Sequence, residues 1–72
     1  MAHFLLECVY PDENAPRGYR SETFPIEADD QRQAIEEATR AAVDKRPFRF
    51  RVRIAGNGFN KILHDSGPLS VP

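Results

Sequence analysis

Between residues 48 and 54 the chain alternates apolar and basic side chains at every step. The apolar members are Phe48, Phe50, Val52 and Ile54, and the basic members are Arg49, Arg51 and Arg53. Successive side chains of a β-strand point to opposite faces, so this period of two predicts a strand. One face of that strand is suited to a core and the other to solvent or a charged partner.

The next segment, Gly-Asn-Gly at 56–58, is typical of a tight β-hairpin turn. Residues 59–64 are therefore expected to return antiparallel to the first strand. Two registers stay open. A two-residue loop pairs Val52 with Leu63, whereas a three-residue loop pairs it with Ile62.

Two further strands are expected in the first 30 residues. Residues 3–10 alternate, and their apolar face carries Phe4, Leu6, Cys8 and Tyr10. Residues 11–21 contain two prolines, Gly18 and several charges, which predicts a loop between strands. Residues 22–28 form the second strand. Because Pro25 lacks an N–H, that strand should lie at a sheet edge or carry a bulge.

A helix is expected between the second and third strands. Asp29 or Asp30 can cap its start, and Pro47 limits its end to near Asp44 or Lys45. At 100° per residue its apolar side is Ala34, Ile35, Ala38, Ala41 and Ala42. Since these are mostly small, the sheet must supply the core volume. The expected residues are Phe4, Leu6, Phe24, Ile26, Phe48, Phe50 and Val52.

The elements together predict an α+β fold. A single antiparallel sheet of about four strands is covered on one face by one helix, in the order β-β-α-β-β. The 72 residues form one domain, with residues 66–72 as an irregular tail. A core of this size rarely supplies more than ~3–5 kcal/mol, and Cys8, the only cysteine, excludes an internal disulfide. Association is therefore the expected source of extra stability, and a homodimer is predicted.

Residues 24–38 read Phe-Pro-Ile-Glu-Ala-Asp-Asp-Gln-Arg-Gln-Ala-Ile-Glu-Glu-Ala. This strand-to-helix junction resembles that of small uncharacterised bacterial α+β proteins, which are domains of unknown function built on a ββαβ core. The resemblance covers about a third of the chain. It implies the fold and brings no catalytic residues with it.

The arginines of residues 48–54 are the sharpest candidate site. Alternate strand residues lie ~6.5–7 Å apart on one face, close to the spacing of phosphates along a nucleic acid strand. His3 is expected on the same face. Glu7 and Glu27 can pair with the arginines across strands. The face is thus open to three interpretations: a salt-bridged surface, a dimer interface that includes Leu5 and Val9, or a site for single-stranded nucleic acid.

The predicted loop at 11–21 is a second candidate contact surface. Its side chains best suited to binding a partner are Arg17, Tyr19 and Arg20. Long loops in small domains often carry function.

Catalysis and metal binding find little support in the residue pattern. His64-Asp65 is the only adjacent pair of histidine and carboxylate, and Cys8 is expected to be buried on the apolar face. The two histidines and the single cysteine show no metal-ligand spacing. We therefore expect no enzyme, no metal and no cofactor.

The expected function is a non-enzymatic protein-interaction or structural module that acts as a homodimer. A lone thiol fits a reducing compartment, and no apolar run approaches a membrane span, so a cytoplasmic location is predicted. The formal net charge of −1 excludes a bulk polycation. The alternative function is single-stranded nucleic-acid binding through Arg49, Arg51, Arg53 and His3.

Overall fold

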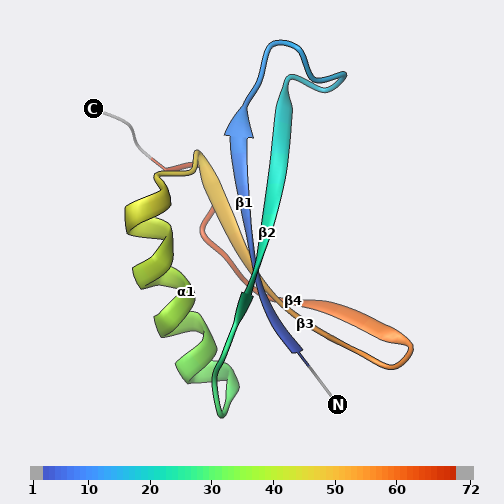
Figure 1. Cartoon of the computed structure of the whole chain (residues 1–72), viewed down its shortest axis with the longest axis vertical. Coiled ribbons are helices and arrows are strands. Elements are labelled where there is room, and N and C mark those ends of the chain that lie inside the picture. The colour runs from blue at the N-terminus through green and yellow to red at the C-terminus, as the bar shows by residue number, and fades with distance from the viewer. Residues whose placement is uncertain (1–2, 70–72) are drawn as a thin grey trace.

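The computed structural model describes residues 3–69 and confirms the predicted fold class (Figure 1). In chain order the elements are β1 (His3–Pro11), β2 (Tyr19–Ile26), α1 (Gln31–Lys45), β3 (Arg49–Gly56) and β4 (Phe59–Asp65). The strands form one antiparallel sheet in the order β2-β1-β3-β4. β2 is thus an edge strand, as Pro25 predicted.

Helix α1 lies across one face of the sheet and begins at a defined cap. The side chain of Asp30, not that of Asp29, accepts a hydrogen bond from the Gln33 amide at 2.8 Å. The Gln33 side chain in turn accepts from the amide of Asp29, the residue before the cap, at 2.7 Å. The helix ends at Lys45, and Arg46 follows in the left-handed conformation with its N–H bonded to the Ala42 carbonyl. Both predicted helix boundaries are confirmed.

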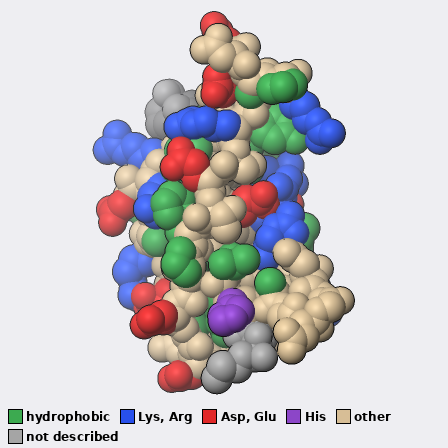
Figure 2. All heavy atoms as spheres, turned by 45° about the vertical axis from the view of Figure 1, so that its right-hand side comes forward, with side chains coloured by type: hydrophobic (Ala, Val, Ile, Leu, Met, Phe, Trp, Pro, Cys, Tyr) green, Lys and Arg blue, Asp and Glu red, His purple; other side chains and the backbone are tan. Residues whose placement is uncertain are grey.

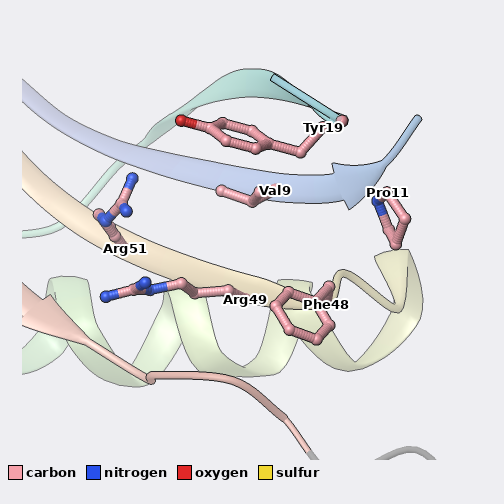
Figure 3. Close-up of a pocket in the computed structure, with 7 residues that line it drawn as sticks. Val9, Pro11, Tyr19, Phe48, Arg49 and Arg51 are labelled. Atoms are coloured by element: carbon pink, nitrogen blue, oxygen red, sulfur yellow. The ribbon is translucent and has the colours of Figure 1, made fainter. Parts of the chain in front are cut away.

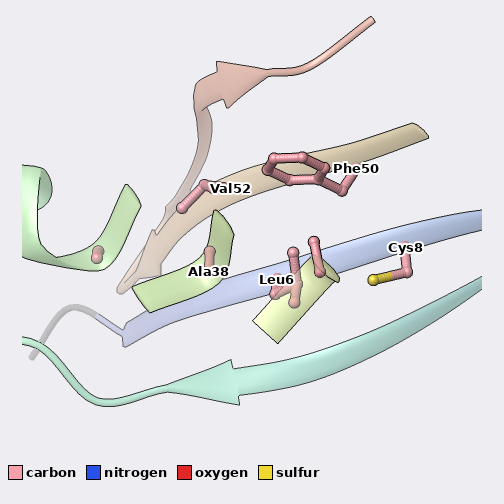
Figure 4. Packing of buried hydrophobic residues seen from close by; sticks show 7 residues of the cluster. Leu6, Cys8, Ala38, Phe50 and Val52 are labelled. Carbon is pink, nitrogen blue, oxygen red and sulfur yellow. The ribbon is translucent and has the colours of Figure 1, made fainter. Parts of the chain in front are cut away.

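The main core lies between α1 and the two central strands (Figure 4). The buried residues of this cluster are Leu6, Cys8, Ala34, Ala38, Ala42, Phe50 and Val52. The prediction for Phe48 is wrong, because its side chain is 42% exposed and lies on the opposite side of the sheet. Phe48 precedes β3, so the alternation of the strand does not extend to it.

The first hairpin differs from its prediction in length. β1 continues through Pro11, and its pairing with β2 begins at Tyr19. The connecting loop is therefore only 12–18, closed by a hydrogen bond from the Asp12 amide to the Gly18 carbonyl at 2.9 Å. Gly18 takes a positive φ of 81°, which a glycine adopts without strain. Tyr19 and Arg20 consequently belong to a strand, not to a loop.

The second hairpin has the two-residue turn Asn57-Gly58, but neither predicted partner of Val52 is correct. Gly56 pairs with Phe59, and the ladder stays regular as far as Arg53 and Ile62. Leu63 is then left over in a bulge, so Val52 pairs with His64 and Arg51 with Asp65. One extra residue on β4 thereby moves Asp65 onto the arginine face of the sheet.

The chain after β4 runs along the start of β3. The Ser66 amide donates to the Phe50 carbonyl at 3.0 Å, and the Leu69 amide donates to the Phe48 carbonyl at 2.8 Å. The predicted irregular tail is thus anchored over 66–69, while its remainder, 70–72, lies outside the described residues.

Candidate interaction surface

Helix α1 leaves the second face of the sheet uncovered. Cross-strand pairing places Leu5, Glu7 and Val9 of β1 beside Arg53, Arg51 and Arg49 of β3 on this face. The predicted row of three arginines is therefore present. Figure 2 shows basic and acidic side chains interspersed on the surface it displays.

Glu7 of β1 forms ion pairs with two of the β3 arginines. Its Oε1 atom accepts a hydrogen bond from Arg51 Nη1 and another from Arg53 Nε, both at 3.1 Å. The Glu7 side chain is only 17% exposed, so these ion pairs are partly shielded from water. Arg53 also donates to the side-chain oxygen of Asn60 at 3.2 Å.

Asp65 of β4 binds the third arginine, Arg49. Arg49 donates to both of its carboxylate oxygens, through Nε at 2.8 Å and through Nη2 at 2.5 Å. Arg51 Nε approaches the same carboxylate at 3.4 Å, and the Gly67 amide donates to it at 3.0 Å. A two-point contact of this kind restricts the guanidinium orientation more than a single bond would.

The two carboxyl groups are held in their ionised form. Burial opposes the charge of Glu7, but hydrogen bonds from Arg51 and Arg53 outweigh it and lower its pKa. The Arg49 hydrogen bonds and the Gly67 amide hold the pKa of Asp65 well below its usual range. Asp65 in turn raises the pKa of Arg49. We call these five groups the arginine–carboxylate network: three positive and two negative charges.

Of the acidic partners considered from the sequence, Glu7 joins the network and Glu27 does not. Glu27 follows the end of β2 and is exposed. His3 is exposed on the network's face and pairs with Ala55 at the far end of β1. Asp65 was missed as a partner because its position depends on the bulge at Leu63, for which the sequence shows no signal.

An open groove of about 390 Å³ adjoins the network near the first hairpin. It is lined by Val9, Pro11, Gly18, Tyr19, Phe48, Arg49 and Arg51. Figure 3 shows Tyr19 on one side of Val9 and Phe48 on the other, with the two arginines toward one end. Tyr19 is 44% exposed and Phe48 is 42% exposed, so both aromatic side chains present apolar surface to solvent.

The three candidates from the first hairpin do not form one surface. Arg17 is exposed in the loop at 12–18, whereas Tyr19 lines the groove. Arg20 lies on the helix side of the sheet, with its guanidinium carbon 4.7 Å from the centre of the Tyr10 ring. It also pairs with Glu22 on its own strand at 3.0 Å.

Cys8, His64 and Asp65 do not come together as a catalytic set. Cys8 is fully buried against α1, and burial raises the pKa of its thiol. Asp65 lies on the opposite face of the sheet, within the network. Among residues 3–69 no group of three or more metal-ligating side chains is placed to hold a metal ion.

Helix α1, the one helix of the described residues, is too short to cross a membrane. Comparison with protein-family models, with curated proteins and with solved structures finds no match to this chain. Its function therefore has to be argued from its geometry.

Proposed function

We propose that this chain is a non-enzymatic, cytoplasmic protein-interaction module that works as a homodimer. The observation that carries the interaction role is the uncovered face of the sheet, where Tyr19 and Phe48 expose apolar surface beside a charged network. Exposed aromatic groups bordered by satisfied charges are characteristic of surfaces that contact another protein.

The size of the core supports association. The buried apolar residues of the described part of the chain include three alanines, Ala34, Ala38 and Ala42, all on α1. Alanine contributes little apolar area, so the helix adds less to the core than its 15 residues suggest. A second copy of the chain can add stability that this small core does not supply. The free thiol of Cys8 suits a reducing compartment such as the cytoplasm.

The homodimer is tested by measuring the molar mass of the native protein in solution. We expect light scattering after size exclusion to give about twice the 8.2 kDa of the chain, falling toward the chain mass on dilution. A mass that stays at that of one chain up to the highest usable concentration contradicts the proposal.

One observation supports single-stranded nucleic acid as a second candidate. Arg49, Arg51 and Arg53 do lie in a row on the uncovered face, and the network keeps one net positive charge. Their hydrogen bonds to Glu7 and Asp65, however, occupy donors that phosphates would need. For this reason the homodimer is preferred.

We expect an amide NMR titration with mixed short DNA and RNA strands at low salt to leave residues 49–53 unshifted. Binding through phosphates weakens steeply as salt rises, because counterions are released. Shifts confined to residues 49–53 and reversed at physiological salt would instead replace the homodimer with nucleic-acid binding as the leading function.

A further inference from the structure

The outer edge of β2 has no neighbouring strand in the described part of the chain. Its first five residues, 19–23, are all exposed, and none is proline or lysine. Proline, lysine and other charged side chains are common means by which proteins prevent an edge strand from pairing with another chain. The two charged residues of this segment, Arg20 and Glu22, have opposite signs and can therefore complement a second copy. Pro25 provides such protection only near the end of β2. On the other edge, β4 is interrupted by the bulge at Leu63.

The backbone groups that face this edge can be identified from the register. The Asp12 amide donates to the Gly18 carbonyl, and the pairing continues without a bulge from Pro11–Tyr19 to Phe4–Ile26. Because hydrogen-bonded pairs alternate along an antiparallel ladder, the even-numbered residues of β2 bond to β1. The N–H and C=O groups of Tyr19, Ser21 and Thr23 therefore point outward. Pro25 falls on the same outward side, where its missing N–H costs no bond to β1.

We infer that a second copy of the chain adds its own β2 antiparallel to this edge, centred on Ser21. This inference rests on the proposed homodimer and places its contact at the β2 edge, beside the uncovered face and not on it. Ser21 would face Ser21 of the partner subunit, and Tyr19 would face Thr23 of the partner subunit. Each of these is a pair that exchanges two backbone hydrogen bonds. The two sheets thereby join into one continuous sheet with both helices on the same side.

The charges on β2 select this register over its neighbours. Centring on Ser21 places Arg20 opposite Glu22 of the partner subunit, and Glu22 opposite the partner's Arg20. A shift by one hydrogen-bonded pair in one direction would set the two Arg20 side chains against each other. A shift in the other direction would do the same to the two Glu22 side chains. Like charges directly opposite destabilise a strand pair, whereas opposite charges stabilise it.

The side chains are placed to make this exchange. Arg20 and Glu22 already form an ion pair with each other at 3.0 Å, and both are close to half exposed. They lie on the same side of β2, so two copies bring four charges of alternating sign together. In the single chain this exposed pair contributes little, because water screens it. Substitutions of Arg20 or Glu22 should therefore change dimer affinity more than the stability of the single chain.

The backbone contact is tested with Ser21→Pro, which removes the central outward donor. The fold should survive, because that N–H makes no bond to β1 and Pro25 shows that the outward positions of β2 accept proline. We expect a folded monomer by light scattering and circular dichroism. Ser21→Ala, which keeps the N–H, serves as the matched control and should remain a dimer. A Ser21→Pro variant that stays dimeric moves the interface elsewhere and overturns this inference while leaving the homodimer intact.

The charge pairing is tested with Arg20→Glu and Glu22→Arg, alone and together. Each single change leaves two like charges per strand and no complementary register, so we expect the dimer Kd to rise roughly tenfold or more. The double exchange restores opposite charges across the interface and should return the Kd to near that of the unmodified protein. A double exchange no tighter than either single change contradicts the register. A monomeric unmodified protein contradicts the homodimer and the interface together.

Discussion

Replacing Leu6 by alanine is expected to lower the free energy of unfolding by about 3 kcal/mol. Leu6 is fully buried on the central strand β1, where its side chain faces α1. Removing it leaves a cavity that the alanines of the helix are too small to fill. A domain of this size holds only ~3–5 kcal/mol from its core, so the variant should lose most of its stability.

Leu5 provides the matched control for this substitution. It is the same residue type on the same strand, but it lies on the uncovered face and is only half buried. We expect Leu5→Ala to cost about 1 kcal/mol, in proportion to the smaller apolar area it buries. Urea unfolding followed by circular dichroism measures both, at one protein concentration because the homodimer couples stability to mass action. A Leu6→Ala variant no less stable than Leu5→Ala would show that the core lies elsewhere.

Replacing Glu7 by glutamine is expected to cost about 2 kcal/mol at neutral pH. The amide keeps the shape of the side chain but removes the charge that Arg51 and Arg53 share. Both guanidinium groups then remain partly buried beside a neutral acceptor. Glu36→Gln on α1 is the control, because the 3.5 Å pair between Glu36 and Arg32 is largely exposed. Removing it should lower the free energy of unfolding by only about 0.3–0.5 kcal/mol.

The same substitution should change how stability depends on pH. The pKa of Glu7 is lower in the folded chain than in the unfolded one, so its contribution is complete at neutral pH. That contribution is lost as the pH falls through the ordinary carboxyl range toward the lowered pKa. Urea midpoints at pH 7 and pH 3 should therefore differ less for Glu7→Gln than for the unmodified protein. Equal differences in the two proteins would mean that the ion pairs of Glu7 add no stability.

Most of the fold was predictable because apolar and polar residues recur along each strand and along the helix with the period of that element. The apolar side of β1, the alanine side of α1 and the arginine side of β3 all lie where period two or period 3.6 puts them. The failures lie at element ends. Phe48 is one residue outside β3 and turns to the other face, and Tyr19 joins β2 because Pro11 extends β1. Such boundaries depend on cross-strand bonds that a local pattern does not contain.

For the candidate surface, the positions of the three arginine donors were predictable, whereas only one of the two carboxylate acceptors was. The arginines follow from spacing within one strand, and Glu7 follows from the parity of the neighbouring strand. The face on which Asp65 lies depends instead on the number of residues between the turn and Asp65. The one-residue bulge in β4 moves Asp65 from one face of the sheet to the other. The groove between Tyr19 and Phe48 was also missed, since both of its aromatic walls come from the misplaced element ends.

The bulge at Leu63 also bears on how this chain should be aligned with others. Leu63 has no partner in the ladder, whereas Ile62 before it and His64 after it pair with consecutive residues of β3. A related chain that lacks this residue would keep every cross-strand pair on either side, including the one between Asp65 and Arg51. Its β4 would look out of phase with the present one when counted from the turn, yet it would display the same charges. An alignment that places a one-residue gap at this position compares like surfaces, and an ungapped one matches the arginine partner to the wrong face.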